Sequence, residues 1–169
     1  MVSALVLGGC ATAAVDGPPL LGQAVLKDKA GQQVGLATFT EEADGVRIEV
    51  TGVGLPPGPK GIHIHAVGRC DPPDFISAGA HLNPAGKKHG RLNPEGAHAG
   101  DLPNLVVTPL GAAGFDATTR AVTLTTGASG SLFGAGGTSL VIHAQTDDEK
   151  TDPTGNSGGR IACGVITRG

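Results

Sequence analysis

The 169-residue sequence predicts one all-β domain, an eight-stranded antiparallel Greek-key sandwich or barrel (immunoglobulin-like) with two long functional loops. Three observations lead to this prediction. The 29 Gly and 12 Pro make about a quarter of the chain turn-forming, which favours short strands over helices. Leu, Ile, Val and Phe contribute about another quarter, enough for a single hydrophobic core. Short segments also alternate between apolar and polar residues, as strands with one buried face do.

Eight segments have the composition and alternation of strands. In chain order they are 23–29, 33–40, 46–51, 61–67, 105–108, 121–125, 139–144 and 161–167. The Pro-rich segment 55–59 is expected to be a connection, because proline cannot occupy the interior of a strand or helix. The two long loops are 68–104 and 145–159. Loops of this length are uncommon in compact domains unless they are functional or disordered.

The first ten residues are apolar and uncharged, and they end in Leu7-Gly8-Gly9-Cys10. This ending resembles the lipobox of bacterial lipoproteins, whose cysteine is lipidated, although the positive residues of a secretory signal are missing. We therefore divide the chain into a lipoprotein-signal-like segment at 1–9, a tether at 10–21 and a domain at 22–169. This division predicts an exported protein of the periplasm or cell envelope, with a lipid anchor at Cys10. The alternative is an apolar N-terminus in which Cys10 has no role.

The other two cysteines, Cys70 and Cys163, lie far apart in the sequence. In an exported protein we expect them to form a disulfide, since that compartment is oxidising. Two buried free thiols are the alternative.

The charge balance excludes some classes of partner. A net charge of −3 and a pI near 6.0 argue against nucleic acid and anionic membrane surfaces, which select a basic excess. No apolar run reaches the length of about 18 residues that a transmembrane helix needs, so we expect no transmembrane segment.

Three histidines lie in segments expected to be strands. His63 and His65 are two positions apart, so on a strand both imidazoles face the same side and can reach one ion. Paired histidines of this kind also occur without a metal. His143 follows the apolar run 140–142 and, taken alone, is more often a hydrogen-bonded core histidine than a ligand.

The first long loop carries the other three histidines. His81, His89, His98 and Asp101 lie within 21 residues of one another. Three imidazoles and one carboxylate satisfy a closed tetrahedral zinc site. The alternative is a solvated polar loop, but few apolar residues hold this segment down, and a metal would supply the missing order.

Three longer motifs make the prediction more specific. The segment GIHIHAVGRC at 61–70 resembles the GxHxHxxGxC signature of copper/zinc superoxide dismutases. The segments 80–84, 88–90 and 98–102 resemble the zinc loop of that family, with ligand spacings of eight, nine and three positions. GNSGGRIACGVI at 155–166 resembles the C-terminal signature of the family.

The resemblance covers about residues 22–169 and assigns every histidine of the chain. The copper ligands that it implies are His63, His65, His81 and His143. The zinc ligands that it implies are His81, His89, His98 and Asp101, with the His81 imidazolate bridging both metals. Asp147, or its neighbour Asp148, would be the carboxylate that links a copper histidine to a zinc histidine, and the alignment favours Asp147.

The resemblance also implies the reaction. Two superoxide anions would be converted to dioxygen and hydrogen peroxide by cycling between Cu(II) and Cu(I), with His81 taking up and returning a proton. Arg160 would attract and orient the anion beside the copper. Such an activity would protect the cell envelope from superoxide. Glu149 and Lys150 either shape the local field or are ordinary solvated residues.

Some departures and rival interpretations remain at this stage. Ala66 and Val67 replace residues that are often bulkier or charged in the family, and the Gly-rich segment 127–138 is longer than usual. The longer segment could alter subunit contacts, so the sequence leaves open whether the protein forms a homodimer. A non-catalytic metal-storing domain would lack a copper ligand or the arginine, and a copper-only relative would lack the zinc ligands. A structural sandwich with incidental histidines is a third rival.

Overall fold

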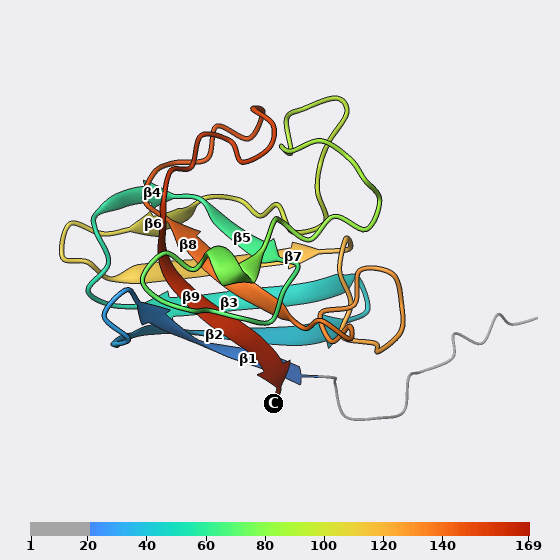
Figure 1. The fold of residues 1–169 in the computed structure, drawn as a ribbon, viewed down its shortest axis with the longest axis horizontal. Coiled ribbons are helices and arrows are strands. Elements are labelled where there is room, and N and C mark those ends of the chain that lie inside the picture. The colour runs from blue at the N-terminus through green and yellow to red at the C-terminus, as the bar shows by residue number, and fades with distance from the viewer. Residues whose placement is uncertain (1–20) are drawn as a thin grey trace, which may run out of the picture.

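A computed structural model describes residues 21–169 and confirms the all-β prediction (Figure 1). It contains nine strands rather than eight, and every paired strand is antiparallel to its neighbour. The strands are β1 (Leu21–Asp28), β2 (Gln33–Glu42), β3 (Gly45–Gly52), β4 (Gly58–Lys60), β5 (Ile62–His65), β6 (Leu105–Val107), β7 (Ala113–Thr119), β8 (Thr138–His143) and β9 (Arg160–Arg168). One short 3-10 turn, η1, spans Ile76–Ala78.

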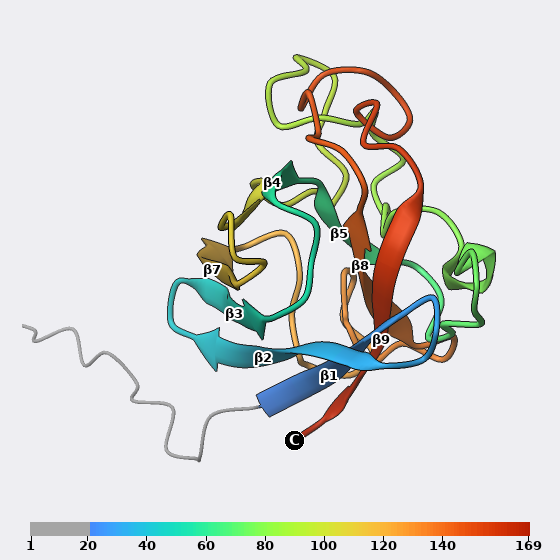
Figure 2. The same ribbon diagram turned by 90° about the vertical axis from the view of Figure 1, so that its left-hand side faces the viewer.

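The nine strands form one sheet that curls into a nearly closed barrel (Figure 2). Their order is β4-β6-β7-β3-β2-β1-β9-β8-β5. The neighbours β3–β7, β1–β9 and β5–β8 are distant in the sequence, so the chain crosses between them as a Greek key requires. The two edge strands, β4 and β5, are consecutive in the chain and separated only by Gly61, which brings the two edges of the sheet together.

The prediction of a strand at 121–125 is wrong. The strand lies earlier, at β7, where seven residues pair with β3. Its sequence AGFDATT contains Gly and Asp, which strands disfavour, so its pairing depends on the partner strand more than on its own composition. The segment 121–125 instead makes only an isolated bridge from Thr123 to Ser131, and the Glu41 carboxylate accepts hydrogen bonds from Thr123 Oγ1 (3.0 Å) and from the Leu124 backbone N–H.

The expectation that 55–59 is entirely a connection is also wrong in part. Gly58–Lys60 forms β4, which pairs with β6 through Pro59 opposite Val106. Proline is tolerated here because β4 is an edge strand, so the missing N–H interrupts no second ladder.

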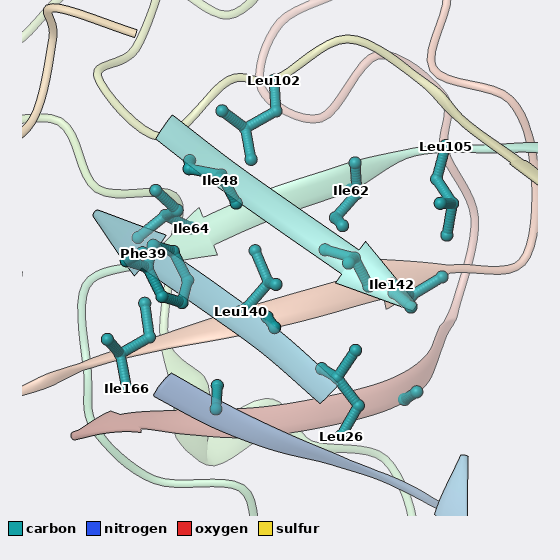
Figure 3. Close-up of a cluster of buried hydrophobic side chains, with 14 of the residues drawn as sticks. Leu26, Phe39, Ile48, Ile62, Ile64, Leu102, Leu105, Leu140, Ile142 and Ile166 are labelled. Carbon is teal, nitrogen blue, oxygen red and sulfur yellow. The ribbon is translucent and has the colours of Figure 1, made fainter. Parts of the chain in front are cut away.

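The hydrophobic core fills the barrel and explains where the histidines point (Figure 3). On β5, Ile62 and Ile64 are buried in this core, so strand alternation turns His63 and His65 to the opposite face. That outer face is also fully buried, because the long loops cover it. The histidines are therefore enclosed between the barrel wall and the loops.

Candidate metal centre

The first long loop is attached to β5 by backbone hydrogen bonds. The Ile64 N–H donates to the Gly100 carbonyl at 2.9 Å, and the Leu82 N–H donates to the Ile64 carbonyl at 2.8 Å. The Gly100 N–H donates in turn to the Leu82 carbonyl at 2.9 Å. A Cβ atom at Gly100 would overlap the Ile64 carbonyl oxygen, so only glycine permits this approach.

This attachment brings residues from the loop beside those of the strand. His65 forms an isolated β-bridge with His81, and His63 forms one with Asp101. Four candidate ligands that are distant in the sequence are thereby placed next to one another.

The predicted disulfide is confirmed. Cys70 and Cys163 are bonded, with their Cα atoms 5.6 Å apart, and the bond joins the first loop to β9. Phe75 and Val141 are fully buried in a small second cluster beside it. The disulfide and this cluster hold the turn that ends at Gly79, whose carbonyl serves the metal centre.

Backbone carbonyls set the protonation of two histidines on the barrel wall. His65 Nδ1 donates to the Gly79 carbonyl at 2.9 Å, and His143 Nδ1 donates to the Gly158 carbonyl at 3.1 Å. Because a carbonyl can only accept, each Nδ1 carries the proton, and each neutral ring presents a lone pair at Nε2. These two Nε2 atoms lie 3.4 Å apart, which suits two ligands of one ion.

Two further buried nitrogens converge on the same place. His63 Nε2 donates to Asp147 Oδ2 at 2.6 Å, which leaves Nδ1 as the free nitrogen. His63 Nδ1 and His81 Nε2 are buried and find no hydrogen-bond partner within residues 21–169. One donor atom from each of His63, His65, His81 and His143 lies within 4.8 Å of the others. Four imidazole nitrogens in this arrangement suit Cu(II), and a bound ion would satisfy the two atoms that lack partners. We call these four residues the copper-side cluster.

A second group surrounds one carboxylate oxygen. The Nδ1 atoms of His81, His89 and His98 lie 2.9, 3.0 and 3.3 Å from Asp101 Oδ1. The other oxygen, Oδ2, accepts backbone N–H bonds from Gly90 at 2.9 Å and His98 at 3.0 Å, which fixes the carboxylate. Three nitrogens and one oxygen that converge in this way suit tetrahedral zinc. We call these residues the zinc-side cluster, and His81 belongs to both clusters.

Asp147 connects the two clusters. Its Oδ2 accepts a hydrogen bond from His63 Nε2 at 2.6 Å, and its Oδ1 accepts one from His89 Nε2 at 3.0 Å. Asn104 holds the Asp147 backbone through hydrogen bonds of 2.8 and 2.9 Å. A Cβ atom at Gly155 would overlap Asp147 Oδ1, so a glycine is needed above the carboxylate.

Asp148 faces the opposite way. Its carboxylate accepts backbone N–H bonds from Lys150 at 2.9 Å and Thr151 at 2.8 Å, and a side-chain bond from Asn156 at 2.9 Å. Of the two adjacent acids, Asp147 therefore reaches the histidines and Asp148 folds the second loop.

Burial keeps three of the copper-side rings neutral. Burial, with repulsion from neighbouring rings, lowers the pKa of His65 to about 2, of His143 to about 3 and of His81 to about 4. Neutral imidazole is the form that binds metals, so these rings are in the binding form at neutral pH.

The zinc side has the opposite electrostatics. Burial lowers the pKa of His89, but the Asp101 and Asp147 carboxylates outweigh it and raise that pKa to about 9. Burial raises the pKa of both carboxyls, but their hydrogen bonds to the histidines outweigh burial. The net pKa of each carboxyl is well below the ordinary range of aspartate. The carboxylates are therefore ionised, and a cation at this place is favoured electrostatically.

Arg160 lies at the edge of the copper-side cluster. Its Nη1 donates to the Phe75 carbonyl at 2.5 Å, and its Nη2 donates to the Gly79 carbonyl at 2.6 Å. The Gly79 carbonyl thus holds both Arg160 and His65. Burial lowers the pKa of the guanidinium, but the ordinary value is so high that the group stays charged. Arg160 and His81 line a cleft of about 580 Å³ over the metal centre.

Sequence reasoning missed several contributors to this centre. The carbonyls of Gly79 and Gly158 orient copper-side rings, but a backbone carbonyl has no signature in the sequence. Asn104 and Asp152 are ordinary loop residues in the sequence. Asp152 Oδ1 nevertheless accepts the His89 N–H at 2.6 Å, and Asn104 holds Asp147. The contacts of both residues cross between the two long loops, which only the folded chain brings together.

Comparison with known proteins agrees with this geometry. Residues 33–166 match the family model described as copper/zinc superoxide dismutase. The chain belongs to the copper/zinc superoxide dismutase family. It is 50% identical over 137 residues to "Superoxide dismutase [Cu-Zn] 1" of Aquifex aeolicus, covering 80% of this chain and 81% of the relative. It is 44% identical over 146 residues to "Superoxide dismutase [Cu-Zn]" of Caulobacter vibrioides, covering 85% of this chain and 83% of the relative.

Among solved structures, the family fold matches that of a SOD-like protein from Bacillus subtilis. The TM-score is 0.82 at 39% identity, covering 85% of this chain and 96% of the other. The predicted resemblance to copper/zinc superoxide dismutases is thus confirmed.

The predictions about the N-terminus concern a part of the chain that the structure does not describe. Cys10, the segment 1–9 and nearly all of the tether at 10–21 lie outside the described residues. From residue 21 onward, no helix is long and apolar enough to cross a membrane.

Proposed function

We propose that this superoxide dismutase holds copper through His63, His65, His81 and His143, and zinc through His81, His89, His98 and Asp101. The observation that carries the proposal is the convergence of the four copper-side nitrogens, two of them buried without a partner in the described chain. His81 turns Nε2 to one cluster and Nδ1 to the other, which supports its role as the bridge.

When bound, copper would supply the one-electron oxidation and reduction, and zinc would hold the His81 ring in place. The chain contributes binding, orientation and a proton. Arg160, held by two carbonyls, orients the superoxide anion in the cleft. His81 takes up a proton at Nε2 and delivers it as peroxide leaves. With this proton and a second one from water, two superoxide anions yield one dioxygen and one hydrogen peroxide.

A non-catalytic metal-storing domain is the rival from another functional class. Identity alone does not exclude this rival, because the relatives include one whose name says only dismutase-like: the chain is 41% identical over 143 residues to "Superoxide dismutase-like protein YojM" of Bacillus subtilis. The separation rests on the residues, since this chain has both complete ligand sets together with Arg160 in the cleft.

Superoxide consumption and metal content, measured on the same purified protein, test the proposal. We expect one copper and one zinc per chain, with activity that requires the copper. Protein that carries both metals and consumes no superoxide would overturn the enzyme and favour metal storage.

We also propose that the domain at 22–169 is exported and attached to the cell envelope through a lipid at Cys10, where it removes superoxide. The lipobox-like segment 7–10 and the disulfide support this location. The strand β1 starts on the side of the barrel away from the long loops that carry the metal ligands, so an anchor that precedes it would leave the cleft unobstructed (Figures 1 and 2). Mass spectrometry of the native protein decides this point, because an intact Met1 with unmodified Cys10 would refute it.

A further inference from the structure

The second long loop reaches the zinc side at two places. At the first, Asp147 accepts a hydrogen bond from His89 Nε2 at 3.0 Å. At the second, Asp152 faces the outer nitrogen of His98. We infer that Asp152 is a further positioning residue of the zinc side, where its carboxylate holds the outer nitrogen of His98 and the backbone of His89. This inference deepens the proposed function and rests on it, because it takes these histidines to be zinc ligands.

Asp152 contacts two zinc-side histidines at once. Its Oδ1 accepts the His89 N–H at 2.6 Å and lies 3.9 Å from His98 Nε2. The other ring nitrogen of His98, Nδ1, lies 3.3 Å from Asp101 Oδ1 and 3.4 Å from His81 Nδ1. His98 therefore turns Nδ1 to the place where the zinc-side atoms converge, and it turns Nε2 to Asp152.

This orientation decides which nitrogen of His98 carries the proton. A neutral imidazole has one N–H and one lone pair, and a metal ion takes the lone pair. With Nδ1 turned to the zinc, the proton lies on Nε2. A distance of 3.9 Å is longer than a hydrogen bond, so the Asp152 carboxylate attracts this N–H electrostatically. A carboxylate on the outer N–H orients the ring and makes the other nitrogen a better ligand.

The Asp152 carboxylate keeps its charge for this role. Within residues 21–169 it forms no salt bridge with a lysine or an arginine. Glu149, on the same loop, differs because its carboxylate lies 3.2 Å from Arg91 Nη1. Both acids connect the second long loop to the first, but Asp152 does so through two zinc-side histidines. Its side chain is 46% exposed, whereas Asp147 is buried, so water weakens its attraction more.

Zinc affinity, measured by competition with a chelator, tests the inference in Asp152→Asn and Glu149→Gln. The two variants are matched, because each replaces a carboxylate of the second loop by an amide of similar size that can still accept a hydrogen bond. Asp152→Asn should weaken zinc binding about tenfold, at the low end of the range for outer partners of metal ligands, since Asp152 is half exposed. Glu149→Gln should match the wild type. Unchanged affinity in Asp152→Asn, or equal losses in the two variants, would overturn the inference.

The ring proton of His98 provides a readout that a merely structural role of Asp152 would not change. In zinc-loaded protein that contains isotope-labelled histidine, NMR follows the exchange of each Nε2 proton with water. Asp152→Asn should speed the exchange at His98 and leave it unchanged at His89, whose Nε2 proton Asp147 holds. Equal acceleration at both rings would indicate a general loosening of the loops and would contradict the inference, as would unchanged exchange at His98.

Neither measurement requires turnover, so the inference and the proposed enzyme can fail separately. Wild-type protein that binds zinc and copper but consumes no superoxide would refute the enzyme, and the comparison of the two variants would still decide the role of Asp152. Wild-type protein that binds no zinc would refute the proposed zinc ligands and this inference together.

Discussion

The copper-side and zinc-side clusters share His81 but are built in different ways. The copper side takes His63, His65 and His143 from β5 and β8, and backbone carbonyls orient two of these rings. The zinc side takes its residues from one loop, and carboxylates orient the rings. Regular strands thus preform the copper side, whereas the zinc side depends on loop order that electrostatic attraction must maintain.

The copper-side and zinc-side clusters also differ in charge. On the copper side, His65, His81 and His143 are neutral because burial lowers their pKa. The zinc side contains an ionised Asp101 and contacts an ionised Asp147, which together raise the pKa of His89 to about 9. The neutral copper-side cluster can therefore be built on the strands of the barrel. The anionic zinc-side cluster lies in a loop and needs a bound cation to stabilise it. Four predictions test this difference.

The largest effect is expected from His143→Ala, which removes a ligand from the barrel wall. Copper binding and superoxide consumption should be lost, while zinc stays bound, because His143 belongs to the copper-side cluster alone and all four zinc-side residues remain. Metal analysis together with an activity assay measures both outcomes. Loss of zinc in this variant would mean that the two clusters are not independent in the way we describe.

The second prediction concerns the pH dependence of the metal-free protein. His65, His81 and His143 have a folded pKa below the unfolded value of 6.5. At acidic pH the unfolded chain therefore binds more protons than the folded chain. Stability should therefore fall below pH 6.5, by roughly 2 kcal/mol per ring at pH 5.

His89 should respond in the opposite direction, since its pKa is raised to about 9. Its contribution is complete below pH 6.5 and is lost as the pH rises through 9. Urea unfolding should therefore find maximal stability of the metal-free protein near pH 6.5. His89→Gln should remove the alkaline loss and leave the acid loss, and an unchanged alkaline loss would contradict this assignment.

The third prediction tests the link between the clusters. Asp147→Ala should weaken zinc about 10- to 100-fold, since it frees the rings of His89 and His63 from their common acceptor. Competition with a zinc chelator measures the change. Asp148→Asn is the control, because within residues 21–169 Asp148 forms no hydrogen bond with a histidine, and the new amide can keep part of the hydrogen bonding in the loop. A larger loss of zinc affinity in the control would reverse the roles of the two acids.

The smallest effect is expected where the loop meets the barrel. Gly100→Ala should lower the free energy of unfolding by about 1 kcal/mol or more, because the new Cβ overlaps the Ile64 carbonyl. Gly114→Ala is the matched control, since a Cβ atom there meets nothing within 4 Å. Urea unfolding of the zinc-loaded protein compares the two variants. Equal stabilities would show that the contact between loop and strand is more adaptable than its geometry indicates.

The sequence predicted the parts of this protein whose signals are local. Alternation predicted most strands and turned His63 and His65 to one face, because side-chain direction repeats every two residues. The motifs predicted the family, because they depend on residue identity and spacing. The expected export of the chain predicted the pairing of Cys70 with Cys163, since that compartment is oxidising. The sequence did not predict the strand β7, because its Gly and Asp have no preference for strands.

Only the tertiary structure decided the contacts that join distant segments. It placed the Gly79 and Gly158 carbonyls against His65 and His143 and directed Asp147 inward. The reason is physical: backbone carbonyls are the same at every position, and a charge acts according to its distance from other charges. Those distances are set when the two long loops meet over the barrel wall.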